Sequence, residues 1–144
     1  MAFQTKFTIY KQDWDADSRK LPAKITDYTY TLTEKVARTF DVAATTEVVV
    51  WDPVNVPSEQ VTAFQYIWFL GDQEFDVEWV VNTGDANLVT QTQRVPAGMP
   101  FLLPSNVAFD GNGGVGLSGT QDVIDQVSVK AGATAAKIQV EIGA

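Results

Sequence analysis

The chain has 144 residues with ten basic and eighteen acidic side chains, a formal net charge of −8, and no cysteine or histidine. Serine–histidine and cysteine–histidine catalysis, histidine-ligated zinc or iron sites and disulfide bonds are therefore excluded. The acidic balance disfavours nucleic acid as a partner, and Arg19-Lys20 is the only adjacent basic pair. We expect no membrane contact either, because the apolar runs are too short for a span and the start MAFQTKFTIY lacks a secretory signal pattern.

The first part of the chain has two stretches with the composition of strands. Residues 3–10 alternate between apolar and polar side chains, and residues 25–32 are rich in Thr and Tyr. The polar stretch 12–22 between them predicts a loop. Residues 33–39 fit a short helical turn capped by Thr33. Further strands are predicted at 40–42, 47–51, 88–95, 123–129 and 136–142.

The densest aromatic stretch of the chain is 61–81, where two β-forming runs flank Gly71-Asp72. This pattern predicts a hairpin with a two-residue type II′ turn. The resulting register places Trp68 opposite Phe75, and side chains alternate with a period of two. One face of the hairpin then becomes the centre of the core, formed by Phe64, Tyr66, Trp68, Phe75, Val77 and Trp79.

The opposite face of that hairpin also carries apolar residues, namely Ile67, Phe69 and Val80, among polar ones. Either another layer of the same chain covers these three side chains or a neighbouring subunit does. We take them as the candidate interface residues.

The remaining sequence completes an all-β pattern. Residues 99–104 form an apolar segment between prolines, typical of an edge or crossover strand, and 106–120 is a glycine-rich loop. Turn signals recur at the spacing of β-sandwiches, and the connections are mostly of hairpin length. The sequence predicts an antiparallel β-sandwich, jelly-roll-like, of about eight to ten short strands. We expect one domain, residues 1–144, with 1–24 as a possible N-terminal arm.

Three acidic or glycine-rich motifs are candidates for metal or catalytic chemistry. Asp13, Asp15 and Asp17 would share one side of an extended segment and offer oxygen ligands to Ca²⁺, but a solvated acidic loop next to Arg19 and Lys20 is the favoured interpretation. Residues 110–114 resemble an EF-hand loop only in part, and a flexible loop is the simpler interpretation. We therefore predict no metal and no cofactor.

Glu74, Asp76 and Glu78 lie at alternate positions, with a separation like that of a carboxylate pair in inverting glycosidases. The same alternation places them on a solvated polar face, which does not tune acids for catalysis, so we predict no catalytic residues and no enzyme. Trp14 and Trp51 lie beside loop-like segments and are candidate platforms for a carbohydrate.

The run EWVVNTGDANLVTQTQRVPAGMPFLLPSN, residues 78–106, and the closing run AAKIQVEIGA, residues 135–144, resemble small auxiliary or decoration proteins of tailed-bacteriophage heads. The resemblance lies in an acidic, cysteine-free β-chain rich in Thr, Val, Gly and Asn. It implies a non-enzymatic protein on the capsid surface of the virion, synthesised in the host cytoplasm. Its partners would be the major capsid protein and further copies of itself, with a trimer favoured. Residues 1–24 would contact the capsid or exchange between subunits.

Two other hypotheses stay open. One is a carbohydrate- or receptor-binding β-sandwich module, such as a head-fibre or tail-adhesion domain, which predicts an exposed Trp or Tyr in a shallow groove. The other is a small carboxylate-dependent hydrolase, which predicts two acids in a concave pocket.

Overall fold

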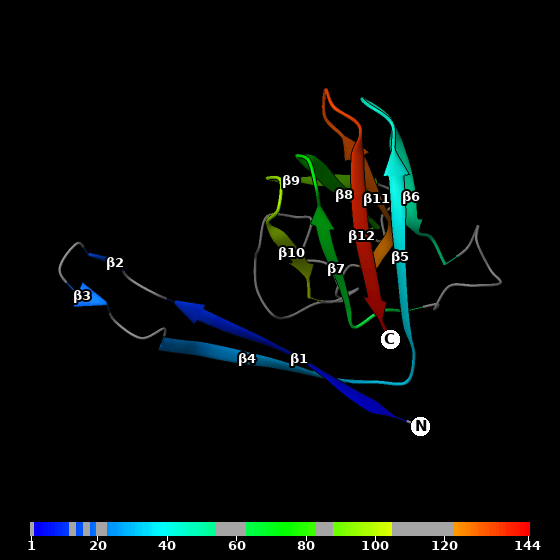
Figure 1. Ribbon diagram of the computed structural model, residues 1–144. Helices are drawn as coiled ribbons and strands as arrows, with labels where there is room; N and C mark the ends of the chain where they lie inside the picture. The colour runs from blue at the N-terminus through cyan, green and yellow to red at the C-terminus, as the bar shows by residue number, and fades with distance from the viewer. Residues whose placement is uncertain are drawn as a thin grey trace. The chain divides into compact units, whose positions relative to one another are not determined.

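The computed structural model describes residues 2–11, 14–15, 18–19, 23–53, 63–82, 88–104 and 123–144, and every regular element in them is a β-strand (Figure 1). The chain divides into two units, Met1–Thr33 and Glu34–Ala144. The described residues contain no helix of the length and apolarity needed to cross a membrane. The strands are β1 (Phe3–Lys11), β2 (Trp14–Asp15), β3 (Ser18–Arg19), β4 (Ala23–Leu32), β5 (Lys35–Val42), β6 (Glu47–Trp51), β7 (Tyr66–Gly71), β8 (Phe75–Asn82), β9 (Leu88–Val95), β10 (Pro100–Leu103), β11 (Val123–Ala131) and β12 (Ala136–Gly143).

The first unit is a long antiparallel hairpin of β1 and β4, with β2 and β3 forming a second short pair. The register runs from Phe3 opposite Leu32 to Lys11 opposite Ala23, with an irregularity after Ile9. Alternation along this ladder collects apolar side chains on one face of the hairpin. That face, here called the hairpin face, consists of Phe3, Phe7, Ile9, Tyr28, Tyr30 and Leu32. The predicted arm, 1–24, thus covers most of a structural unit that continues to Thr33.

The second unit consists of two four-stranded antiparallel sheets packed against each other, in the orders β10-β7-β12-β5 and β6-β11-β8-β9. Figure 1 shows β7, β12 and β5 side by side in the nearer sheet. The pairing is nested along the chain: β5 pairs with β12, β6 with β11, β7 with β10 and β8 with β9. Eight strands folded over in this way form a jelly roll. The predicted fold class is therefore confirmed.

The core lies between the two sheets. Strand β12 shows how the sequence builds it, because Ile138, Val140 and Ile142 point inward and are buried while Lys137 and Gln139 point outward and are exposed. Burying each such aliphatic side chain stabilises the fold by about 1.5–3 kcal/mol. The largest fully buried side chains of the sandwich are Trp51, Tyr66, Phe69, Phe75, Ile67, Ile124 and Ile138.

The predicted hairpin at 61–81 is wrong, because β7 and β8 belong to opposite sheets. Strand β7 pairs with β10 and β12, and β8 pairs with β9 and β11. The connection after Gly71 crosses between the sheets instead of closing a tight turn. Asp72 holds it to β12, since its carboxylate accepts a hydrogen bond from the Lys137 backbone N–H at 2.7 Å. Both strands contribute to one core, but from opposite sides.

This arrangement also reverses the predicted faces of β7. Ile67 and Phe69 are 0% exposed within the core, so the chain itself covers these two candidate interface residues. Trp68 points away from the core and is only partly buried. On β8 the predicted inward face is confirmed, with Phe75 and Val77 buried.

The other predicted core residues of the stretch are also buried, namely Phe64, Tyr66 and Trp79, although Tyr66 lies outside the core cluster. Val80, the third candidate interface residue, is half-buried and alternates with the inward residues of β8. The interface prediction stays a prediction for Val80.

Two further predictions can be compared with the strands. The helical turn at 33–39 is wrong, because Lys35–Val42 is the edge strand β5, held by its complete ladder with β12. The proline-bounded segment at 99–104 was expected at an edge, and Pro100–Leu103 does form the edge strand β10. The glycine-rich stretch 106–120 lies outside the described residues.

Candidate functional site

Two surfaces gather side chains that the fold does not use in its core, and the hairpin face is the first. Phe3, Ile9 and Tyr28 on this face are 39%, 44% and 45% exposed. Phe7 and Tyr30 contact each other edge to face, with ring centroids 6.0 Å apart and planes at 81°. Burial raises the pKa of the Tyr30 phenol, and the neighbouring Tyr28 adds to the rise. The hairpin face is therefore an aromatic ribbon with half of its large side chains open to solvent.

The two units also differ in charge. Residues 1–33 contain five basic and four acidic side chains, a net charge of +1, whereas residues 34–144 contain five basic and fourteen acidic ones, a net charge of −9. The acidity of the protein therefore belongs entirely to the sandwich.

The second surface is a groove on the outer face of the sheet β10-β7-β12-β5. It consists of two adjacent hollows of about 240 Å³ and 340 Å³, which share Thr39 and Gln139 as lining residues. These two residues are direct partners across β5 and β12. The hollows exist because the outward residues of β5 at this place, Ala37 and Thr39, are short, while Trp68 and Glu141 are long. We call this surface the outer groove.

A hydrogen-bonded group fixes one end of the outer groove. The Tyr66 hydroxyl donates a hydrogen bond of 2.6 Å to Glu141 Oε1, and Lys35 Nζ lies 3.6 Å from Glu141 Oε2. The Tyr66 ring lies directly over Gly143, where any Cβ would collide with it. Glycine at that position is therefore required for the ring to lie flat, and the ring in turn orients the Glu141 carboxylate.

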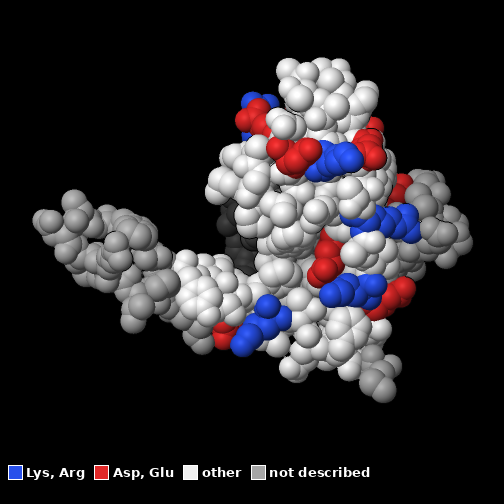
Figure 2. Space-filling model, in the orientation of Figure 1, with Lys and Arg blue, Asp and Glu red and all other residues white. Residues whose placement is uncertain are grey.

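The charges at the other end of the outer groove are balanced too. Lys137 Nζ lies 3.8 Å from Asp41 Oδ1, and the carboxylate of Asp72 is hydrogen-bonded to backbone. On the face shown in Figure 2, basic and acidic side chains lie beside one another in small groups over the sandwich. The described part of this face therefore has no large patch of a single charge.

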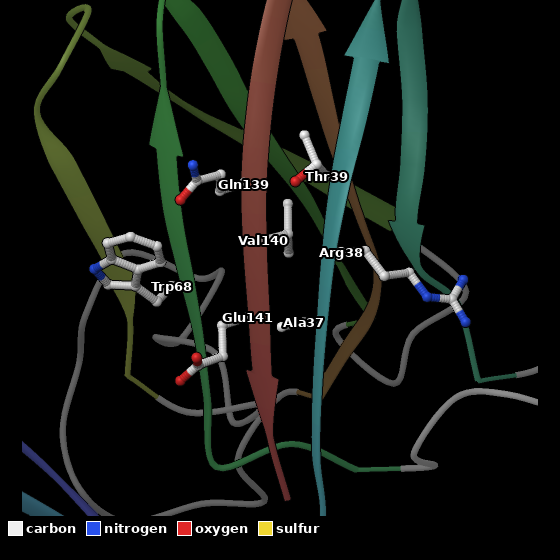
Figure 3. A pocket seen from close by; sticks show the side chains of 7 residues that line it. All are labelled: Ala37, Arg38, Thr39, Trp68, Gln139, Val140 and Glu141. Atoms are coloured by element: carbon white, nitrogen blue, oxygen red, sulfur yellow. The ribbon is translucent and has the colours of Figure 1, made fainter.

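The middle of the outer groove carries side chains of another kind. Figure 3 shows Gln139 and Glu141 extending from β12 toward β7, and Trp68 extending from β7 away from β12, whereas Arg38 of β5 extends in the opposite direction. Trp68 and Glu141 are direct partners across β7 and β12. An indole on β7, an amide on β12 and a hydroxyl on β5 thus lie on the same face of one sheet, with the amide on the strand between the other two.

Trp51, one of the two aromatic platforms predicted from the sequence, does not line this groove. Trp51 is 1% exposed and packs edge to face against Phe64 in the core, with ring centroids 4.8 Å apart, so its prediction as a platform is wrong. Trp14 lies in β2, and the prediction about its side chain stays a prediction.

The predicted acidic face of β8 is held by a basic neighbour. Arg94 Nε donates to Asp76 Oδ1 at 3.0 Å and lies 3.8 Å from Glu74 Oε1. The hydrogen bond with Asp76 raises the pKa of Arg94, and the charges of Asp76 and Glu74 act in the same direction. This ion-paired group does not line either hollow of the outer groove.

Among the described residues there is no group of three or more acidic side chains that could hold a metal ion. Asp13 and Asp17, which were considered as calcium ligands, and the loop 110–114 lie outside the described residues. Buried polar side chains in the described part include Ser128, whose hydroxyl bonds Glu47 at 2.5 Å, and Asp52, which accepts from Gln126 at 3.1 Å. These bonds satisfy buried groups and join neighbouring strands.

Sequence reasoning missed the outer groove. The alternation of 136–142 correctly placed Lys137, Gln139 and Glu141 outward, which was the available signal. The sequence prediction pointed Trp68 into the core because it paired β7 with β8, whereas Trp68 lies on the outer face of its sheet. Comparisons of the chain with protein-family models, curated proteins and solved structures give no match.

Proposed function

We propose that this protein is a non-enzymatic virion structural protein that binds and reinforces the outside of a phage capsid as a homo-oligomer, with a trimer favoured. The observation that carries the proposal is the hairpin face. Two-stranded ribbons are marginally stable alone in water, and they gain stability when their apolar face is packed against another layer. Three large side chains of this face are exposed by 39% or more, which supports a role in contacts with other chains.

The distribution of charge also supports assembly. Two sandwiches of net charge −9 repel each other, so the hairpin unit, of net charge +1, is the part of one copy whose charge favours contact with the sandwich of another. A hairpin from one copy that docks on the sandwich of the next would bury aromatic side chains and pair opposite charges together. Such an exchange of one element between identical subunits is a common route to closed oligomers.

The chemistry available to the chain agrees with a structural role. The sequence has no histidine or cysteine, and the best-placed acidic cluster is paired with Arg94. The resemblance of residues 78–106 to head decoration proteins points the same way. Under this proposal the major capsid protein is the partner in the virion.

Light scattering of the full-length chain tests the assembly. We expect a homo-oligomer of the 15.8 kDa chain, and we expect the double substitution Ile9→Ser with Tyr28→Ser to shift it toward the monomer. Leu88→Ser is the matched control, because Leu88 is 63% exposed but lies on β9 of the sandwich. A monomeric wild type, or an oligomer that the double variant leaves intact, contradicts the proposal.

The capsid partner is tested by co-sedimentation with capsids assembled from the major capsid protein encoded near this gene. We expect the wild type to sediment with intact capsids and to raise their resistance to heat. A gene neighbourhood without capsid genes, or a chain that stays in the supernatant, contradicts the capsid assignment. Such a result would not bear on self-assembly through the hairpin face, which light scattering tests separately.

A further inference from the structure

The outer groove has a composition that the assembly function does not require. Trp68 keeps part of its indole exposed in the middle of a sheet, at the wall of a hollow whose floor is formed by Ala37 and Thr39. The partners of Trp68 on the two adjoining strands are Leu102 of β10 and Glu141 of β12. Beyond Glu141, the short side chains of Ala37 and Thr39 on β5 leave space over the sheet.

The charges around the outer groove are already satisfied. Glu141 is held by Tyr66 and Lys35, and Lys137 lies next to Asp41. A phosphate or sulfate group would have to break one of these pairs to gain a partner, and the net charge of −9 on this unit would repel it. The electrostatics therefore favour a ligand without charge.

The polar groups at the junction of the two hollows are different. Gln139 is exposed, and its amide presents two donors and an acceptor, while the Thr39 hydroxyl opposite is one donor and an acceptor. A ligand that matches them must carry both donors and acceptors. Hydroxyl groups meet this requirement in either orientation.

The two hollows, of about 240 Å³ and 340 Å³, lie consecutively along the same strands and together fall within the range of small-molecule sites, roughly 300–1,000 Å³. We propose that the outer groove binds a neutral oligosaccharide. The indole plane of Trp68 packs against the apolar C–H face of a pyranose ring, because stacking buries apolar area without loss of the ring's hydroxyl hydrogen bonds. Gln139 and Thr39 bond the hydroxyls of the adjacent sugar.

Isothermal titration calorimetry with the full-length chain tests this site. The probes are neutral hexasaccharides of β-1,4-linked glucose, α-1,4-linked glucose and β-1,4-linked N-acetylglucosamine, with a heparin hexasaccharide as the charged comparison. We expect at least one neutral probe to bind and heparin not to bind. Trp68→Ala should weaken binding about tenfold or more, and Gln139→Ala about two- to tenfold.

Two control variants test whether binding depends on an aromatic ring at position 68 and not on exposed aromatic rings elsewhere in the chain. Trp68→Phe keeps an aromatic plane and should retain most of the affinity, while Tyr10→Ala removes a 62% exposed aromatic ring from the hairpin and should leave affinity unchanged. Absence of binding to all neutral probes, binding of heparin alone, or binding that is insensitive to Trp68→Ala overturns the inference. The Ile9→Ser, Tyr28→Ser variant should bind the sugar as the wild type does, so failure of assembly and failure of the groove are distinguishable.

Discussion

The sandwich and the hairpin use the same alternating sequence pattern with opposite results. In the sandwich, inward residues such as Phe69 and Ile138 are completely buried because a second sheet faces them. In the hairpin, Leu32 is the only buried apolar residue among the described side chains, and Phe3 and Tyr28 stay exposed. Alternation therefore determines which side chains share a face, but it does not determine what covers that face. The sandwich buries its inward face within one chain, whereas the hairpin leaves half of the large side chains on its apolar face exposed.

The largest expected effect comes from comparing one residue type in the two units. Phe69→Ala should lower the free energy of unfolding of the sandwich by about 3–5 kcal/mol, because it opens a cavity between the sheets. Phe7→Ala, in the hairpin, should change that free energy by less than about 0.5 kcal/mol. Urea denaturation followed by circular dichroism measures both. Equal costs would mean that the two units share one cooperative core.

A smaller loss of stability is expected at Gly143, where the outer face of the sandwich is tightly packed. Gly143→Ala should cost about 1–3 kcal/mol, since the new Cβ would collide with the Tyr66 ring. Gly132→Ala is the matched control, because a Cβ there meets only the Glu74 carbonyl oxygen at an ordinary 3.6 Å. Thermal unfolding of the two variants provides the test. A Gly143→Ala variant as stable as Gly132→Ala would show that the ring does not lie over the glycine.

A still smaller effect is expected at the outer groove. Trp68→Ala should cost less than about 1 kcal/mol, since Trp68 points away from the core, whereas a cost of about 3–5 kcal/mol is expected for a buried Trp such as Trp51. The same urea titration distinguishes the two substitutions. A large cost at Trp68 would place this residue in the core and remove the groove as a ligand site.

The smallest effect concerns the pH dependence of the hairpin. Burial raises the pKa of Tyr30 in the folded hairpin above that of the unfolded chain, about 10. Below that pH both states keep the phenol proton and Tyr30 has no influence on stability. Above it the unfolded state releases the proton first, so hairpin stability falls as the pH rises. Tyr30→Phe should remove this part of the alkaline transition seen by near-ultraviolet circular dichroism; an unchanged transition would contradict it.

Much of the fold followed from local pattern. The faultless alternation of Ala136–Ile142 identified β12 and its buried side, and the prolines around Phe101 identified an edge strand. Pairing between strands did not follow, because it depends on contacts between residues far apart in the chain. Gly71-Asp72 has the composition of a tight turn, yet the backbone there crosses between sheets, since β12 is the better partner for β7.

The same limit explains what was missed at the candidate sites. A single wrong pairing turned Trp68 inward and Phe69 outward, because a strand's two faces differ by one residue. The groove also needs Thr39 and Gln139 from strands about a hundred positions apart, so no window of sequence brings them together. The alternation of residues 3–10 was visible from the sequence, but the pairing of this strand with β4, which completes the hairpin face, was not predicted.

The nested order of the jelly roll has a consequence for how the chain is made. Strand β12 lies between β5 and β7, so its sheet cannot close until residues 136–143 have been synthesised. Until then, β5 and β7 each have an unpaired edge, and their apolar faces stay exposed to solvent in the nascent chain. Chains with such distant pairings fold slowly, on the order of milliseconds to seconds. The hairpin of β1 and β4, by contrast, pairs residues at most about thirty positions apart, so its ladder can form before the sandwich has folded.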